Sequence, residues 1–297
     1  MDRRDFLKNS IVAAGAAACF GTFNRPASAQ ESSASQKAVL KLSSQEGVCP
    51  GKNFAEKVAN LEKWGAAGIE LGDGFDPKEV NEVLKNSKLK VSAICAAAGP
   101  YIVSDTAQQR RAVDNAKRIL DKAGEVGSTG VIMVPSFNGQ KNQLWGGEAH
   151  KVLVDLLREM GEHAVKCNCR MLLEPLNKGE AWYLRNLAEA AEICRAVNSP
   201  GVAMMGDFYH MHLEETSDQG AFISAGKYLH HVHLATRTRN RTMPHQDNSD
   251  YRDGFIGLKR IGYQDYCSLE CGCRGDRMVE IPKTFRYLEK QWEEATI

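Results

Sequence analysis

The sequence predicts an α/β protein built as a single (β/α)8 TIM barrel, and three observations support this. Apolar runs typical of strands alternate with amphipathic stretches typical of helices, giving eight strand–helix pairs. The strand-like runs are continuously apolar, as expected for parallel strands that are covered on both faces. Residues 38–297 also match the usual size of one such barrel, about 250 residues.

Each predicted strand is followed by its predicted helix. The strands are expected at 38–44, 68–74, 90–99, 130–137, 169–177, 201–210, 229–237 and 265–272. The helices are expected at 53–68, 76–88, 105–127, 147–168, 186–199, 218–229, 253–262 and 279–295. No helix opens with G-x-G-x-x-G or G-x-x-x-x-G-K-[ST], so a nucleotide-binding open sheet lacks its main signal.

The N-terminus has the features of an export signal. Arg3-Arg4 begins a twin-arginine pattern, an apolar stretch follows at 11–23, and Ala27-Ser28-Ala29 is a cleavage signal. We expect residues 1–29 to be a signal peptide and the protein to be exported to the periplasm by the twin-arginine pathway. Lipoprotein anchoring at Cys19 is the second choice. Residues 30–37 are expected to form a polar linker, and no segment is apolar enough to span a bilayer, which takes about 20 residues.

The net charge and the cysteine spacing disfavour a nucleic-acid-binding protein and a structural zinc site made of cysteines. Removing residues 1–29 takes four basic and two acidic side chains from the 38 and 37 of the full chain, which leaves a net charge of −1. A nearly neutral protein has no field that attracts nucleic acid. The C-x-C pairs at 167–169 and 271–273 lack the C-x2-C spacing of structural zinc sites. The sequence does not decide whether the cysteines form disulfides after export. It also leaves open whether the protein forms a homo-oligomer.

Polar residues end the last four predicted strands. They are Glu174, Asp207, His233 and Glu270. The carboxyl ends of parallel barrel strands converge on one mouth, where such folds place their chemistry. A charged side chain that ends an apolar strand is costly unless a partner or a metal compensates it. The recurrence of this pattern therefore predicts one shared divalent metal ion.

The donor set indicates which chemistry that ion supports. Carboxylates with one imidazole suit Mn²⁺, Mg²⁺, Co²⁺ or Zn²⁺. Such an ion polarises a carbonyl and a neighbouring hydroxyl, which acidifies the carbon–hydrogen bond between them. Glu174 and Glu270 come from non-adjacent strands and are placed to act as an acid/base pair on that carbon. His231 lies on the same strand face as His233, and we expect a structural role for it.

These residues resemble a known family. Glu174-Pro-Leu-Asn177-Lys-Gly-Glu180, Asp207-Phe-Tyr-His210, His231-Val-His233 and Ser268-Leu-Glu270 resemble motifs of the xylose-isomerase-like sugar epimerases. That superfamily contains ketose 3-epimerases, hydroxypyruvate isomerases, inosose dehydratases and endonuclease-IV-type nucleases. The resemblance covers the whole barrel in architecture, and its specific motifs lie in the C-terminal half.

The resemblance implies roles for single residues. Glu174, Asp207, His233 and Glu270 correspond to metal ligands, and Glu174 and Glu270 also to the proton-transfer pair. Glu180 and His210 correspond to substrate-contacting residues, and Arg239 to the arginine six positions after the ligand histidine. Arg237 and Arg241 flank it, and the loop 236–254 departs from the family's Pro-Gly-x-Gly turn.

Three residues outside these motifs are further candidates for the site. Glu70 ends the second predicted strand, and Trp145 and Trp182 lie in predicted mouth-side loops. Tryptophan rings commonly stack on sugar faces, so we expect Trp145 to contact a carbohydrate substrate. Ordinary loop packing would explain either ring equally well.

We therefore expect a metal-dependent isomerase or epimerase of a sugar or keto-sugar in carbohydrate metabolism. The alternative is a lyase or hydratase that acts on a keto-sugar or keto-inositol with the same metal site. An endonuclease-IV-like nuclease is disfavoured, because the second and third predicted strands end without histidine. A non-catalytic sugar- or metal-binding barrel is the remaining class.

Overall fold

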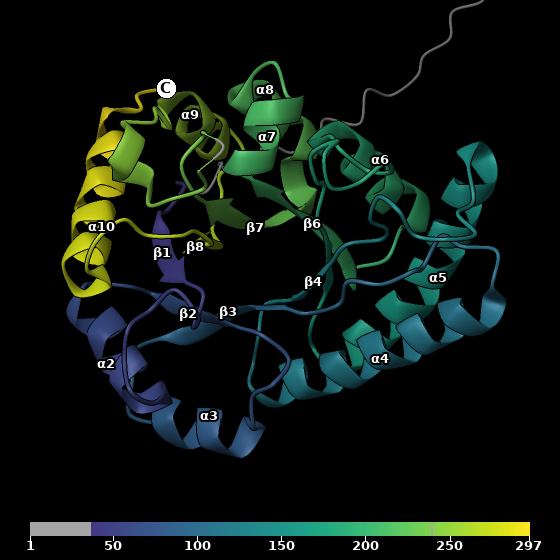
Figure 1. Ribbon diagram of the computed structural model, residues 1–297, viewed down its shortest axis with the longest axis horizontal. Helices are drawn as coiled ribbons and strands as arrows, with labels where there is room; N and C mark the ends of the chain where they lie inside the picture. The colour runs from purple at the N-terminus through teal and green to yellow at the C-terminus, as the bar shows by residue number, and fades with distance from the viewer. Residues whose placement is uncertain (1–36, 239) are drawn as a thin grey trace, which may run out of the picture. The chain divides into compact units, whose positions relative to one another are not determined.

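The computed structural model describes residues 37–238 and 240–297, and it confirms the predicted (β/α)8 barrel. Parallel strands form a ring with the helices around its outside (Figure 1). The strands are β1 (Lys41–Ser44), β2 (Gly68–Leu71), β3 (Lys90–Cys95), β4 (Val131–Met133), β5 (Met171–Leu173), β6 (Val202–Asp207), β7 (Leu229–Leu234) and β8 (Tyr266–Leu269). The helices are α2 (Phe54–Lys63), α3 (Pro77–Leu84), α4 (Thr106–Glu125), α5 (Gly146–Lys166), α6 (Leu187–Val197), α7 (Phe208–Glu214), α8 (Asp218–Ala225), α9 (Arg252–Arg260) and α10 (Arg277–Glu294), with short 3-10 turns η1 (Gly226–Tyr228) and η2 (Pro244–Asp247).

The strands are joined in the order β1-β8-β7-β6-β5-β4-β3-β2, and every pair is parallel. Between β1 and β2 the ring is closed by single contacts. Gln45 and Glu70 form an isolated parallel bridge, and the Ala67 amide donates to the Leu42 carbonyl over 2.7 Å. This contact brings Glu70 next to the end of the first strand.

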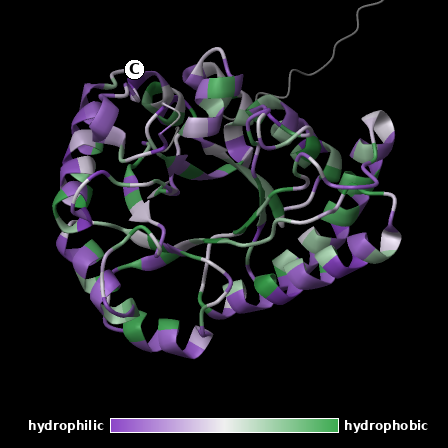
Figure 2. Ribbon diagram, viewed as in Figure 1, coloured by the Kyte–Doolittle hydropathy of each residue, from purple (hydrophilic) through white to green (hydrophobic). Residues whose placement is uncertain are grey.

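Alternation along each strand divides the apolar residues into two layers. Ala93, Ile132, Leu172, Ala203 and Met205 pack together as a small cluster inside the ring. The larger core lies between the strands and the apolar faces of the helices. Figure 2 shows the helices striped with hydrophilic and hydrophobic residues, as expected when one face of each helix packs on the strands. Strands that bury both faces are the reason for the unbroken apolar runs in the sequence.

The boundaries differ from the predicted ones mainly at the mouth. The predicted strand 201–210 ends at Asp207, because the Asp207 carboxylate accepts a hydrogen bond from the Tyr209 amide (2.8 Å) and so begins α7. His210 therefore lies on a helix. The predicted helix 218–229 ends at Ala225, where Gly226 takes a positive φ of 53°.

Several predictions concern residues outside the described part of the chain. These are the signal peptide at 1–29, the anchoring alternative at Cys19 and most of the linker at 30–37. Export and the N-terminal domain boundary therefore stay predictions. Among the helices that the structure describes, none combines the length and apolar character that a bilayer crossing requires.

We expect Gly201→Ala to destabilise the barrel, because α5 packs directly on the entry to β6. A Cβ atom at Gly201 would lie 2.1 Å from the Gly161 carbonyl oxygen, which is backbone and cannot turn away. Overpacking of this kind should lower the free energy of unfolding by about 2–3 kcal/mol in urea denaturation. Gly147→Ala is the control, since nothing lies within 4 Å of its added Cβ, and it should stay within about 0.5 kcal/mol. Equal losses in the two variants would contradict this packing argument.

Candidate active site

Strand alternation places the predicted site residues at the mouth of the barrel. Leu172 points into the ring, so Glu174, two residues later, enters its carboxyl end. Asp207 and His233 are direct partners in the β6–β7 register. His233 pairs in turn with Ser268, two residues before Glu270. The register thus brings the four predicted strand ends to one place.

The four side chains converge. One ligand atom from each of Glu174, Asp207, His233 and Glu270 can be chosen so that all lie within 4.8 Å of one another. Glu174, Asp207 and His233 are 5%, 1% and 0% exposed, and the Glu270 side chain is 22% exposed. The juxtaposition predicted from the sequence is therefore present. The roles assigned to the residues stay predictions.

Glu70 forms a second layer beneath this cluster. It is fully buried at the end of β2 and accepts hydrogen bonds from Gln45 Nε2 (2.8 Å) and from the Nε2 atoms of His231 (2.8 Å) and His233 (3.0 Å). Burial would raise the pKa of Glu70, but the charge of His233 and the hydrogen bonds from both imidazoles lower it below its usual range. The carboxylate therefore holds both rings in fixed orientations.

His233 joins the two layers through its two ring nitrogens. With Nε2 on Glu70, Nδ1 faces the cluster, 2.9 Å from Glu270 Oε2 and 3.7 Å from Glu174 Oε1. Nδ1 is nevertheless a buried atom without a partner of hydrogen-bonding geometry. Burial opposes protonation of this ring, but the nearby Glu70 and Glu270 carboxylates raise the pKa of His233 well above its usual value. An imidazole nitrogen without a hydrogen-bond partner, next to two buried carboxylates and one half-buried carboxylate, is the donor set of a divalent metal site.

Arg241 is the cation that the structure places on this cluster. Its Nη2 atom donates to Asp207 Oδ2 (2.7 Å) and to Glu270, and its guanidinium lies 4.8 Å from the centre of the Tyr209 ring. Arg237 turns away and pairs with Asp218. Arg239, the predicted substrate-binding arginine, lies outside the described residues. The substrate contact predicted for Arg239 therefore stays a prediction, and the contact of Arg241 with Asp207 and Glu270 was not predicted from the sequence.

His210 and Glu180 are held together at the rim by Asn177. His210 Nδ1 accepts a hydrogen bond from the backbone N–H of Asn177 (3.2 Å) and lies 2.8 Å from the side-chain nitrogen Asn177 Nδ2. The same Nδ2 atom donates to Glu180 Oε1 (2.8 Å). Because Nδ1 is the acceptor, the ring proton resides on Nε2, 3.4 Å from Asp207 Oδ2. The sequence motif contained Asn177, but its function as the link between the two residues was missed.

The pKa values of the predicted acid/base pair shift in opposite directions. Burial, with the charge of Glu270, raises the pKa of Glu174. Burial would do the same to Glu270, but His233 and Arg241 outweigh it and lower the pKa of Glu270 to about 2. The two carboxylates thus differ in proton affinity although they lie in the same cluster.

A cavity of about 360 Å³ opens over the cluster. It contains Glu174, Glu180, His210, Arg241 and Glu270 on its polar side. The opposite wall is apolar and consists of Ala96, Ala98, Ile132, Val134, Phe137 and Leu176. A site with one apolar wall and a few convergent polar groups is typical of small-molecule binding.

A second cavity of about 360 Å³ adjoins the first. Both contain Cys95 and Glu270, and Gln45, Glu46, Gly47, Glu70, Leu71 and Gly72 complete the second one. Trp145 lines neither cavity: it is 63% exposed and stacks on Trp182 with 4.2 Å between ring centres. Its predicted contact with substrate stays a prediction.

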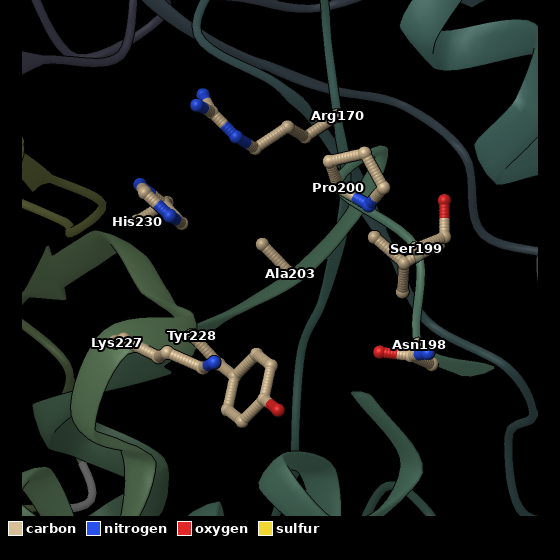
Figure 3. A pocket seen from close by; sticks show the side chains of 9 residues that line it. Arg170, Asn198, Ser199, Pro200, Ala203, Lys227, Tyr228 and His230 are labelled. Carbon is tan, nitrogen blue, oxygen red and sulfur yellow. The ribbon is translucent and has the colours of Figure 1, made fainter. Parts of the chain in front are cut away.

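A third cavity, of about 310 Å³, lies at the other end of the barrel. Its lining comes from the segments that enter β5, β6 and β7, as Figure 3 shows with Arg170, Pro200 and Tyr228 around Ala203. Lys227 and His230 add positive charge, and the described residues contribute no carboxylate to its lining. This end therefore lacks the acidic donors that the mouth provides.

Comparisons with known proteins find a family model, curated relatives and solved structures that are similar to this barrel. A family model described as xylose isomerase-like TIM barrel matches residues 58–291. A 3-dehydro-D-guloside 4-epimerase from Escherichia coli (strain K12) is 27% identical over 252 residues, which cover 80% of this chain and 94% of the relative. A probable ketose 3-epimerase from Synechocystis sp. is 27% identical over 221 residues, 71% of this chain and 76% of the relative. The crystal structure of 3-keto-D-glucoside 4-epimerase from E. coli, in its apo form, has a TM-score of 0.76 at 24% identity and covers 85% of this chain and 100% of that one.

We expect Glu70→Gln to weaken divalent metal binding, because an amide cannot accept from both imidazoles as the carboxylate does. Loss of such an outer partner should lower the affinity for Mn²⁺ about 10- to 100-fold, measured by calorimetric titration of metal-free protein. Glu46→Gln is the matched control: Glu46 lines the neighbouring cavity and pairs with Lys57 (2.9 Å). Equal Mn²⁺ affinities for the two variants would show that Glu70 does not orient a ligand.

Proposed function

The chain belongs to the xylose isomerase-like TIM barrel family, as its strand-end motifs predicted, and from this premise we propose that it is a divalent-metal-dependent epimerase of a keto-sugar. The relatives support an enzyme that acts on sugars, since they include a 3-dehydro-D-guloside 4-epimerase and a probable ketose 3-epimerase. One observation carries the finer proposal. Glu174 and Glu270 approach the same His233 nitrogen from β5 and β8, which are not neighbouring strands.

The residues that would hold the metal are Glu174, Asp207, His233 through Nδ1, and Glu270. When bound, a divalent ion supplies Lewis-acid polarisation of the substrate's carbonyl and adjacent hydroxyl oxygens. The buried carboxylates also favour it, because Arg241 and His233 together offer less positive charge than Glu70, Glu174, Asp207 and Glu270 require. Mn²⁺, Mg²⁺, Co²⁺ and Zn²⁺ all suit this donor set.

The two glutamates carry out the proton transfers. One carboxylate removes the proton from the carbon next to the carbonyl, and the electrons of that bond form the enediolate. The other glutamate delivers a proton to the opposite face of the same carbon, which inverts its configuration. His210 and Arg241 line the cavity, and their N–H groups are the donors that would hold substrate oxygens during this exchange.

The two adjoining mouth cavities suggest a substrate larger than one sugar ring. The keto-sugar ring would occupy the cavity that contains Glu174 and His210. A glycosidic substituent would extend into the cavity beside Gly47 and Gly72. We therefore propose a keto-glycoside as the preferred substrate class.

We expect Glu174→Gln and Glu270→Gln each to lower kcat by about 10²- to 10⁴-fold, because each variant lacks one proton carrier. The measurement is an activity screen in D₂O, in which 3-keto-glycosides and free ketoses are incubated with the protein and Mn²⁺, Co²⁺, Mg²⁺ or Zn²⁺. The epimer should carry deuterium at the inverted carbon, and a chelator should abolish its formation.

Glu162→Gln, an exposed position on α5, is the control and should retain full activity. An unsaturated product instead of an epimer would identify a lyase with the same proton abstraction. Undiminished turnover in both glutamate variants would exclude the proposed acid/base pair.

We expect Gly47→Phe to impair the reaction of keto-glycosides but not that of free ketoses. Nothing lies within 4 Å of a Cβ atom at this position, so the phenyl ring fits there and would occupy space beside the second cavity. The KM for a 3-keto-glycoside should rise at least about tenfold, a loss of ~1.4 kcal/mol, whereas kinetics with a free ketose should not change. Gly74→Phe is the control, since Gly74 also has open space around it but does not line the cavity. An equal rise in KM for the 3-keto-glycoside and the free ketose would show that the glycosidic substituent does not bind in the second cavity.

A further inference from the structure

A third group of metal-ligating side chains lies on the outer helices, away from the mouth. Asp121 on α4 and His163 on α5 approach Cys167, the residue that ends α5. Helices α4 and α5 lie side by side on the outside of the barrel (Figure 1). Among the described residues, the other groups that could hold a metal are the two layers of the mouth, Glu70 with its histidines and the four-residue cluster.

The geometry of this group is close to that of a chelate. His163 and Cys167 are four residues apart, so their side chains emerge from the same face of the helix end. Asp121 Oδ1 lies 2.7 Å from His163 Nε2 and 3.4 Å from Cys167 Sγ. All three ligand atoms lie within 4.8 Å of one another. Zinc bonds of about 2.0–2.3 Å to such atoms require only that the carboxylate and imidazole move slightly apart.

We propose that Asp121, His163 and Cys167 form a zinc-type metal site that links α4 to α5. A nitrogen, an oxygen and a sulfur donor suit Zn²⁺ or Co²⁺, whereas Mg²⁺, Mn²⁺ and Ca²⁺ prefer oxygen ligands. On binding, the Cys167 thiol releases its proton to solvent, and a sulfur–metal bond replaces the S–H···O hydrogen bond to Asp121. Solvent reaches the site, because the Asp121 and His163 side chains are 57% and 27% exposed, and a water molecule completes the coordination.

The sulfur donor distinguishes this site from the mouth. The four-residue mouth cluster has only oxygen and nitrogen donors, so a thiolate-to-Co²⁺ charge-transfer band cannot arise from it. Cys95 is the thiol to control at the mouth, because it lines the mouth cavities. Cys169 is a matched neighbour: it is 5% exposed, and its thiol is directed at the Arg170 carbonyl.

The test is a Co²⁺ titration of the full chain under reducing conditions, followed by near-ultraviolet absorption. We expect a thiolate band whose final intensity corresponds to one Co²⁺ ion with a sulfur ligand, besides the ion held at the mouth, and Zn²⁺ should displace it. It should be present in the unaltered protein, Cys95→Ser and Cys169→Ser, and absent in Cys167→Ser. His163→Gln keeps the thiol and should weaken Co²⁺ binding by roughly tenfold or more.

Circular dichroism verifies that the variants fold, and Cys167→Ser should keep the unaltered activity with Mn²⁺ and keto-glycosides. A band that is missing from the unaltered protein, persists in Cys167→Ser or disappears in Cys95→Ser would overturn the proposal. Because this readout does not depend on turnover, its failure is distinct from a failure of the proposed epimerase function.

Discussion

The hydrogen bond between Glu70 and His233 is the interaction on which the rest of the site depends. A carboxylate that is completely buried is costly unless donors surround it, and Glu70 is fully buried with three donors: Gln45, His231 and His233. This pairing fixes the tautomer and the orientation of the His233 ring, so that Nδ1 faces the carboxylates of the mouth. The ring closure between β1 and β2 is part of the same arrangement, because Gln45 and Glu70 form the bridge there.

The barrel interior is unevenly polar, and this explains the shape of the cavity above it. Under β3 to β6 the interior is apolar, with Ile132 and Leu172 in contact. Near β1, β2 and β7 it is polar: the Ser43 hydroxyl on β1 lies 2.7 Å from the Ser92 hydroxyl near the start of β3, and His231 on β7 is bonded to Glu70 on β2. The cavity is divided in the same way. Its apolar wall consists mainly of residues on or after β3 and β4, and its acidic and basic groups lie after β5, β6 and β8 and in the loop after β7. A keto-sugar has the same two sides, with carbon–hydrogen bonds on its ring faces and oxygens along its edge.

The sequence predicted those parts of the structure that follow from local periodicity. Leu172 and Glu174 alternate along their strand, and later strands show the same pattern. This was enough to predict that the strand-end residues lie together, because the carboxyl ends of all strands in a parallel barrel lie at the same mouth. It could not predict contacts that depend on where a loop goes. The approach of Arg241 depends on the folded path of a segment that contains three arginines within five residues. Likewise, the partners of Glu70 are apparent only once the closed barrel brings β2 close to β7 and to the end of β1. His210 was predicted to extend a strand that Asp207 in fact ends by capping a helix.

The carboxylates of the site differ in how firmly hydrogen-bond donors hold them. Asp207 is held at both oxygens, by the Tyr209 amide and by Arg241, and can do little except orient and coordinate. Glu70 is held by three donors. Among the described residues, Glu174 receives no hydrogen bond of good geometry, has only the 3.7 Å contact with His233, and has a raised pKa because it is buried. In the proposed proton transfers this freedom favours Glu174 as the base, since each donor that stabilises the charge of a carboxylate also weakens it as a base.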